Sequence, residues 1–345
     1  MPTSVEDFIR TKKKVLCAPY LYNSVLIFDG CSLYLCSQLF TESNATLSYG
    51  RMIELELCPP PSADLLFSSL CSNDSGSFAA IIAPYGVYLV DLPRHLWVLQ
   101  SADVQSTIEQ WSEKYYCRCE AVNQNLMLTD RAPLVTKFSW CKRSWKELGH
   151  SRTTKFAVLY SDDVIRLYDA NVCFTSPLLK IDFRSMLSPA DSSGSRFHRL
   201  GLFNSIASFD FGPRIECRDE CSGETVHLST IFAVDTEHND IYVAAFRLDS
   251  NIVFNSIGPL ALQPVLASDK ASDLCDLLFL RCSESGLLNV FAFVTGDGLL
   301  VHFLPLFSCV DLVDHSLDCE LYMYDMIKIP TISQEISPVI FKGTL

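Results

Sequence analysis

The chain has 345 residues, of which 49% are apolar and 19% charged, and its 27 Lys and Arg against 40 Asp and Glu give a net charge of −13. This composition excludes an intrinsically disordered chain, because enough apolar surface is present to form a core. The acidic balance also argues against a nucleic-acid-binding face, which needs Lys and Arg to neutralise phosphates.

The start of the chain is predicted to be a short leader followed by strands. Residues 1–14 are expected to form a basic N-terminal leader, in which Lys12–Lys14 is the only tight basic run. Residues 15–28 follow it as an apolar region follows the charged start of a signal peptide, but a proline and polar residues interrupt them, so two short strands are predicted. No stretch approaches the roughly 18 consecutive apolar residues that a membrane-spanning helix needs.

A hairpin pattern recurs five times along the chain. Each copy has an apolar run, a short turn containing Gly, Asp or Asn, and a second apolar run, and these turn residues tolerate unusual backbone angles. Apolar residues occupy both alternating sets of positions in the flanking strands, so both faces of each hairpin are expected to be buried. The copies lie at residues 25–36, 78–90, 156–168, 231–246 and 290–303.

A further strand ending in a cysteine precedes several hairpins, at 65–71, 135–141 and 277–282. Antiparallel units of three or four short strands, buried on both faces by their neighbours, indicate an all-β chain of the β-propeller class, with about five blades over residues 15–320. A WD-type blade takes about 40–45 residues, so the wider spacing here predicts long loops near 100–133 and 184–200.

Two segments leave alternatives open. Residues 177–187 alternate like an outer strand, but Leu179, Phe183 and Leu187 also fall on one face of a helix, and the strand is favoured. The apolar run 320–330 is interpreted as the opening of a sixth unit. Residues 321–345 are therefore expected to begin a truncated further blade in an incomplete ring.

The fifteen cysteines are predicted to be free thiols, because most lie in or beside apolar runs and their number is odd. A zinc site drawn from Cys217, Cys221, His227 and His238 has poor ligand spacing. A redox pair at Cys117-Arg118-Cys119 has no activating helix terminus nearby. The sequence therefore predicts no metal and no cofactor.

Catalytic signatures are also missing from the sequence. It contains no phosphate-binding Gly loop, no Gly-x-Ser-x-Gly elbow and no His-Glu-x-x-His. Asp210-Phe211-Gly212 spells the metal-binding motif of protein kinases, but the other kinase motifs are lacking, so a strand end before a Gly212-Pro213 turn is favoured. The chain is predicted not to be an enzyme.

Several segments resemble a known family. They are YSDDVIRLY at 160–168, ASFDFGP at 207–213, IGPL at 257–260 with Pro264, GVYLVDLPR at 86–94 and GDGLL at 296–300. In this order, over roughly residues 20–330, they are similar to the amino-terminal propeller of the eighty-eight-kilodalton nucleoporin family of the cytoplasmic face of the nuclear pore. Members of that family look like a propeller followed by a long coiled-coil tail, and no heptad region follows residue 330 here.

The resemblance implies a structural role at the nuclear pore complex, on the cytoplasmic face of the nuclear envelope. The propeller would dock the autoproteolytic domain of the Gly-Leu-Phe-Gly nucleoporin and the tail of the large cytoplasmic Phe-Gly nucleoporin, and so support mRNA export and protein transport. No direct nucleic-acid partner and no membrane span are expected. The alternative is a generic propeller adaptor for protein interactions, for example a substrate receptor of a ubiquitin ligase.

Partner-binding residues are predicted in the 184–200 loop. Met186, Leu187 and Phe197 are apolar residues within an otherwise polar insertion, and such side chains can anchor a partner. The alternative is that they pack against their own blade.

Overall fold

The structure is a computed structural model, and all but two of the strands in its described residues form five four-stranded meanders, which we call blades 1 to 5 in chain order. Two compact units divide the chain: unit 1 comprises Met1–Val135, Arg152–Thr154 and Ala170–Ser176, and unit 2 comprises Thr136–Ser151, Lys155–Asp169 and Pro177–Leu345. The described residues are 15–21, 24–40, 47–62, 65–93, 115–129, 131–141, 154–172, 174–183, 206–218, 223, 225–235, 240–247, 252–256, 260, 262–263, 274–281, 289–295, 299–312 and 314–328.

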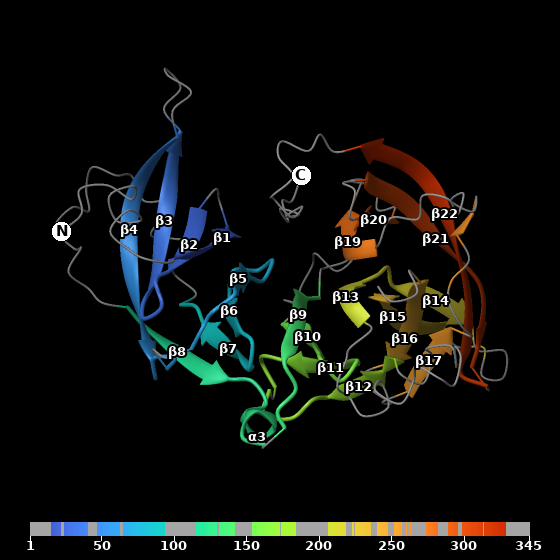
Figure 1. Ribbon diagram of the computed structural model, residues 1–345, viewed down its shortest axis with the longest axis horizontal. Helices are drawn as coiled ribbons and strands as arrows, with labels where there is room; N and C mark the ends of the chain where they lie inside the picture. Colours follow the sequence, from blue (N-terminus) through green and yellow to red (C-terminus); the bar gives the residue numbers. More distant parts are fainter. Residues whose placement is uncertain are drawn as a thin grey trace. The chain divides into compact units, whose positions relative to one another are not determined.

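Unit 1 contains blades 1 and 2, which share one eight-stranded sheet (Figure 1). The blades join through their last strands, because β4 pairs with β8 in parallel, with Leu55 opposite Tyr115. Blade 1 consists of β1 (Leu16–Tyr20), β2 (Ser24–Phe28), β3 (Leu33–Phe40) and β4 (Leu47–Cys58), and blade 2 of β5 (Ser69–Ser72), β6 (Phe78–Ala83), β7 (Gly86–Asp91) and β8 (Tyr115–Ala121).

The core of unit 1 lies between these two blades. Alternate residues of each strand point into it, as the period of two along a strand requires. Phe28 meets Phe67 there in an edge-to-face contact, with ring centroids 5.0 Å apart. The buried members from the central strands include Leu26, Phe28, Leu33, Leu35, Ala79, Ile81 and Val90. A four-residue helix, α3 (Gln124–Met127), follows β8.

Unit 2 contains blades 3 to 5. Blade 3 consists of β9 (Val135–Trp140), of which Val135 belongs to unit 1, β10 (Lys155–Tyr160), β11 (Val164–Asp169) and β12 (Leu179–Asp182). Blade 4 consists of β13 (Ile206–Phe211), β15 (Thr225–Asp235), β16 (Asp240–Arg247) and β17 (Ile252–Ser256), and blade 5 of β19 (Leu274–Arg281), β20 (Asn289–Thr295), β21 (Leu299–Asp311) and β22 (Ser316–Lys328).

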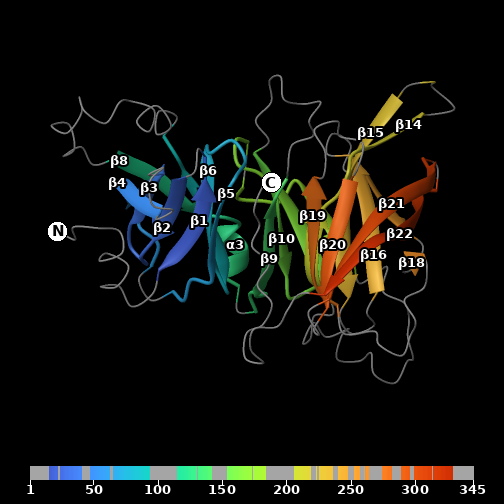
Figure 2. The same ribbon diagram turned by 90° about the horizontal axis from the view of Figure 1, so that it is seen from above.

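Two short strands extend this pattern in unit 2. β14 (Ile215–Arg218) pairs with the first residues of β15, so these two strands form a ribbon beyond the part of β15 that pairs with β16 (Figure 2). β18 (Leu262–Gln263) pairs with β22, which also pairs in parallel with β17. Blades 4 and 5 are therefore joined through their last strands, as blades 1 and 2 are.

Blade 4 is buried on both faces, as the sequence pattern predicted. Ile231, Ala233, Tyr242 and Ala244 pack in one apolar cluster with side chains of blade 3. The alternating residues of the same strands, Phe232, Val234, Ile241 and Val243, pack in a second cluster with side chains of blade 5. Stacked blades explain why apolar residues occupy both alternating sets of positions.

The prediction of an all-β chain with propeller-type blades is confirmed. Each of the five predicted hairpins forms the two central strands of one blade, and the three predicted preceding strands correspond to β5, β9 and β19. The strand favoured within 177–187 is also confirmed over Leu179–Asp182, where buried and exposed residues alternate.

The structure differs from the expected elements in two places. Tyr115–Ala121, expected within the 100–133 loop, forms β8, because alternate side chains such as Cys117 and Cys119 enter the core while their neighbours stay outside. The run that suggested a sixth unit lies in β22, which pairs with β21 from Leu299–Lys328 to Asp311–Ser316 and completes blade 5. Residues 1–14 and 329–345 lie outside the described residues.

Candidate partner-binding site

The predicted partner-binding residues Met186, Leu187 and Phe197 lie outside the described residues, but both ends of their segment are described. The backbone N–H of Phe183 donates to the backbone oxygen of Asp163 at 3.2 Å. The backbone N–H of Ile206 donates to Asp163 Oδ1 at 2.9 Å. Asp163, in the turn between β10 and β11, therefore anchors both ends of segment 184–205.

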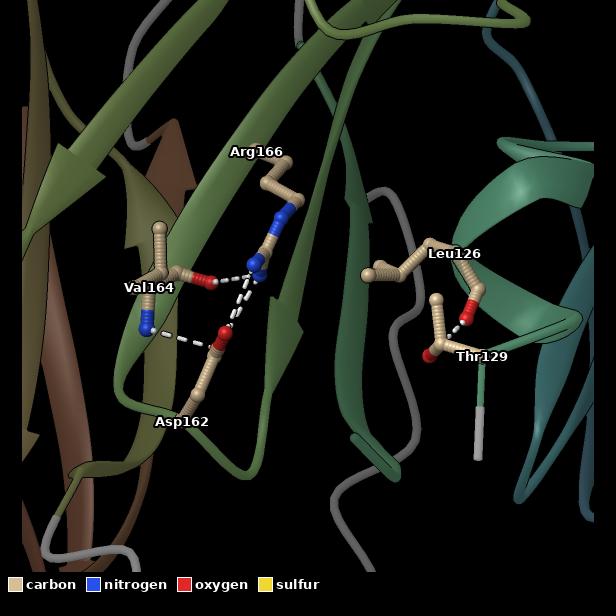
Figure 3. Close-up of polar contacts among 5 residues, drawn as sticks. All are labelled: Leu126, Thr129, Asp162, Val164 and Arg166. Atoms are coloured by element: carbon tan, nitrogen blue, oxygen red, sulfur yellow. Dashed lines mark hydrogen bonds and ion pairs between the residues drawn. The ribbon is translucent and has the colours of Figure 1, made fainter. Parts of the chain in front are cut away.

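The conformation of that turn follows from its aspartates. Asp163 is buried and has φ 56°, in the left-handed region that Asp tolerates better than most residues. Its neighbour Asp162 accepts hydrogen bonds from the backbone N–H of Val164 at 3.2 Å and from Arg166 Nη1 at 3.0 Å and Nη2 at 2.6 Å. Figure 3 shows the Arg166 guanidinium directed at Asp162.

Arg166 is buried and therefore depends on this pairing. Burial lowers its pKa, but the hydrogen bonds and charge of Asp162 more than offset that effect, so the pKa of Arg166 lies above its ordinary value. The guanidinium carbon also lies 4.8 Å from the centroid of the Tyr160 ring. A turn with its charges satisfied in this way is a rigid base for the segment that Asp163 anchors.

A second candidate surface lies at one end of blade 2 in unit 1. Among the described residues, eight large apolar side chains are exposed, and five of them belong to segments that meet near the turn between β6 and β7. We call this set the exposed apolar cluster. Its members are Leu66, which is 76% exposed, Tyr85 (57%), Leu128 (75%), Leu134 (43%) and Val172 (74%).

Backbone hydrogen bonds hold these segments together. The N–H of Val135 donates to the oxygen of Pro84 at 2.7 Å, which brings Leu134 beside Tyr85. The N–H of Ser68 donates to the oxygen of Ile82 at 2.8 Å and places Leu66 near the same turn.

The helix and the 171–176 segment join this end of blade 2 as well. A Cβ on Gly86 would lie 2.3 Å from Met127 Cε, so α3 packs directly on the turn. The N–H of Asn123 donates to the oxygen of Phe174 at 2.8 Å, which ties the segment containing Val172 to the start of the helix. Four separate stretches of chain therefore contribute to one surface.

Two hydroxyl groups near the exposed apolar cluster are used internally. Thr129 Oγ1 donates to the backbone oxygen of Leu126 at 2.8 Å (Figure 3), and Ser68 Oγ donates to the oxygen of Ile82 at 3.1 Å. Arg131 is the one charged side chain among the described residues of these stretches. Apolar surface with few charges is typical of the centre of a protein interface.

The cysteine motif in β8 does not form a reactive site. Cys117 and Cys119 point into the core of unit 1 and are each 1% exposed. Burial, together with the charges of Asp91 and Glu120 respectively, raises the pKa of both thiols to about 12. A thiol that stays protonated at neutral pH is a poor nucleophile and metal ligand.

The two candidate zinc ligands that the structure describes, Cys217 and His227, do not converge. Cys217 in β14 lies opposite Val226, whereas His227 lies opposite Glu216 and contacts it at 3.5 Å between Nδ1 and Oε1. Neighbouring positions along a strand point to opposite faces. Cys221 and His238 lie outside the described residues. Across the part of the chain that the structure describes, no group of three or more His, Cys, Asp or Glu could hold a metal ion.

Asp210 of the Asp-Phe-Gly tripeptide has a structural position. It is fully buried at the end of β13, where its Oδ1 accepts from Ser139 Oγ at 2.6 Å and from the N–H of Phe211 at 3.0 Å. Gly212 and Pro213 follow, and Thr230 Oγ1 donates to the oxygen of Pro213 at 2.7 Å. The predicted strand end is confirmed, but the chain does not turn after it, because β14 continues in the same direction along β15.

Within the described ranges, no helix is both long and apolar enough to cross a membrane.

Comparison with known proteins gives a family match over most of the chain. A family model described as Nup88, nuclear pore component, matches residues 18–306. The protein npp-24 of Caenorhabditis elegans is 23% identical over 295 residues, which cover 84% of this chain and 41% of that protein. The chain thus spans less than half the length of this curated relative.

Two solved structures have a similar fold. One chain of the yeast heterotrimeric Nup82-Nup159-Nup116 nucleoporin complex matches with a TM-score of 0.51 and 10% identity, over 91% of this chain and 76% of that chain. One chain of the Chaetomium thermophilum heterotrimeric Nup82 NTD-Nup159 TAIL-Nup145N APD complex matches with a TM-score of 0.54 and 12% identity, over 94% and 76% of the two chains. At such identities the likeness concerns the fold alone.

Proposed function

Because the chain belongs to the Nup88 family of nuclear pore components, we propose that it is a structural nucleoporin whose blades form a docking scaffold on the cytoplasmic side of the nuclear pore. The observation that carries this proposal is the family match over residues 18–306, which includes strands from all five blades. In this role the chain supports mRNA export and protein transport by holding other nucleoporins, and it has no enzymatic activity of its own.

The proposed partners are the autoproteolytic domain of the Gly-Leu-Phe-Gly nucleoporin and the tail of the large cytoplasmic Phe-Gly nucleoporin. The similar folds in heterotrimeric complexes with Nup159 and with Nup116 or Nup145N support this choice. The acidic net charge of −13 fits protein partners better than RNA, because it repels phosphates.

Two surfaces are proposed to make the contacts. The first is the segment that Asp163 anchors at both ends, with Met186, Leu187 and Phe197 as apolar anchors for a partner. The second is the exposed apolar cluster of unit 1, whose large side chains and few charges suit the centre of an interface.

The proposal is tested by mixing the chain with the autoproteolytic domain of its Gly-Leu-Phe-Gly nucleoporin and following the mixture by size exclusion at moderate salt. We expect a stable one-to-one complex. A correctly folded chain that forms no such complex, and instead captures ubiquitin-ligase subunits, would show that it is a generic propeller adaptor.

The role of segment 184–205 is tested by changing Met186→Asp and Leu187→Asp together in the same assay. Charged side chains in an apolar interface should weaken the complex by at least about tenfold. Unchanged affinity with an unchanged melting temperature would remove this segment from the interface.

A further inference from the structure

The hairpin of β21 and β22 extends well beyond its neighbour β20. β20 pairs with β21 only from Phe291–Phe303 to Val294–Leu300, whereas β22 pairs with β21 as far as Asp311. We call the extended part, Leu304–Asp311 with Ser316–Met323, the distal ribbon. It has one inner and one outer face, because side chains alternate along each strand.

The inner face of the distal ribbon belongs to the core of unit 2. Leu317, Cys319 and Leu321 are buried there, with Phe307 and Val310 packed against them. Phe307 also meets Phe232 of blade 4, with ring centroids 6.2 Å apart. This packing fixes the ribbon and determines which side chains its outer face presents.

The outer face combines exposed apolar and acidic side chains. Leu306 is 54% exposed and lies opposite Glu320, and Tyr322 is 40% exposed and lies opposite Leu304. Asp318 lies on the same side of β22, two residues from Glu320, and is exposed. Leu306 and Glu320 are thus direct cross-strand neighbours, and Asp318 and Tyr322 each lie two residues from Glu320 along β22.

Hydrogen bonds hold both carboxylates on this face. Tyr322 Oη donates to Glu320 Oε2 at 2.8 Å, and Ser308 Oγ donates to Asp318 Oδ2 at 2.5 Å. The side chains are therefore oriented before any partner arrives, which lowers the entropy cost of binding.

Between residues 304 and 323 every charged side chain is acidic, and His315 is the single histidine. Residues 304–323 contain Asp311, Asp314, Asp318 and Glu320 and no Lys or Arg. Such a surface repels RNA and anionic lipid, and it attracts a cationic partner. Pro305 has no N–H to donate, and prolines of this kind discourage strand addition along an edge, so the partner is expected to contact the outer face.

From this arrangement we infer that the outer face of the distal ribbon binds a protein segment in which Lys or Arg residues flank an apolar side chain. The cationic groups pair with Asp318 and Glu320, and the apolar side chain covers Leu306 and Tyr322. The inference rests on the proposed function as a docking scaffold and adds the chemistry of one of its partners.

The test uses the full chain and two labelled peptide probes, one with a central Leu flanked by Lys residues and one with the same Leu flanked by Glu residues. Fluorescence anisotropy at low salt should detect binding of the Lys probe and not of the Glu probe. Combined Asp318→Asn and Glu320→Gln substitutions should weaken binding about tenfold, and Leu306→Ser several-fold.

Matched controls separate a specific site from the general acidity of the chain. Asp74→Asn with Glu54→Gln removes the same charge from exposed positions in unit 1, where Glu54 also accepts a hydrogen bond, from Ser32. Tyr116→Ser truncates another exposed large side chain, on β8 and outside the exposed apolar cluster. These controls should bind the Lys probe like the wild type.

Three results would overturn the inference: equal binding of both probes, an equal loss in the control variants, or no binding of the Lys probe. Binding of polyuridine RNA or phosphatidylserine vesicles that the distal-ribbon substitutions abolish would also overturn it, by assigning the face to another class of partner. The proposed function is judged separately by the complex with the autoproteolytic domain, so either idea can fail alone.

Discussion

Asp162 and Asp163 are adjacent residues with separate tasks in the turn between β10 and β11. Asp162 neutralises the buried Arg166 through two guanidinium nitrogens. Asp163 uses its backbone oxygen and its carboxylate to hold the ends of segment 184–205. The positions of Phe183 and Ile206, which flank the first candidate binding segment, therefore depend on a turn of two acidic residues.

Removing the Asp162 carboxylate tests how much the buried Arg166 charge needs its ion-pair partner for the fold to be stable. Asp162→Ala leaves the Arg166 charge, 9% exposed at its side chain, without its ion-pair partner, so we expect a loss of about 3 kcal/mol in the free energy of unfolding, measured with urea. Asp162→Ala combined with Arg166→Met should lose clearly less. Equal losses in the single and double variants would show that the ion pair is not the cause.

The thiols of Cys117 and Cys119 predict a decline in stability at alkaline pH. Burial raises the pKa of both to about 12, from an ordinary value of 9.0. The unfolded chain loses these protons first, so the stabilising effect is complete below about pH 9 and is lost as the pH rises toward 12. Each thiol contributes a slope of about 1.4 kcal/mol per pH unit in that range.

This loss of stability at alkaline pH is measured by urea unfolding between about pH 8 and pH 10. Replacing Cys117→Ala and Cys119→Ala should flatten the dependence on pH, although it lowers stability at pH 8 by removing core volume. Cys31→Ala with Cys58→Ala, at exposed positions, serves as the control and should retain the wild-type slope. A slope unchanged in the core variant would contradict the assignment.

The strands of this protein are specified by the apolar runs of each hairpin and by close contacts between strands. Gly212 illustrates such a contact, because a Cβ there would lie 2.4 Å from Thr230 Oγ1 and 2.6 Å from Phe232 Cε2. Both side chains belong to β15 and are buried. The end of β13 can approach β15 only with glycine at this position.

Gly212→Ala should therefore lower the free energy of unfolding by about 2 kcal/mol, because the Phe232 ring and the Thr230 hydroxyl must move. Gly86→Ala is the matched control, since its Cβ would meet the flexible end of Met127. We expect a smaller loss in the control, as measured by chemical denaturation. A larger loss of stability for Gly86→Ala would contradict this expectation, because it would mean that the Met127 side chain cannot move aside.

At the scale of the whole molecule, parallel pairing of last strands joins blade 1 to blade 2 and blade 4 to blade 5. β4 with β8 and β17 with β22 form these junctions. The exposed apolar cluster then remains as a large apolar surface with few charges, on a chain whose net charge is strongly negative. This contrast favours a protein partner for the cluster.

Truncating the cluster should weaken docking without unfolding the protein. Leu128→Ser with Val172→Ser removes two side chains that are about three-quarters exposed, so we expect an unchanged melting temperature and at least about a tenfold loss of affinity for the partner complex. Isothermal titration measures the affinity. Tyr116→Ser, also exposed but on β8, should bind normally, and an equal loss there would argue against a defined site.

The local sequence was sufficient for the hairpins and their burial. Apolar runs separated by turn-forming Gly, Asp and Asn fix strands within a few residues, so all five central hairpins were predictable. β8 was not recognised, because Tyr115–Ala121 mixes Tyr, Cys, Arg and Glu and becomes a strand by pairing with β4 and β7. The run in β22 was assigned to a new unit, since the sequence does not show that β21 continues far enough to pair with it.

The candidate binding surfaces also depend partly on local sequence and partly on tertiary structure. By itself the sequence determined the all-β class, the repeated blade unit, the acidic charge and the family resemblance, because these depend on composition and on short-range order. Only the tertiary structure decided that Leu66, Tyr85 and Leu128 share one surface while the equally apolar Cys117 and Cys119 are buried. Burial is a property of neighbours distant along the chain, and no local pattern records which neighbours those will be.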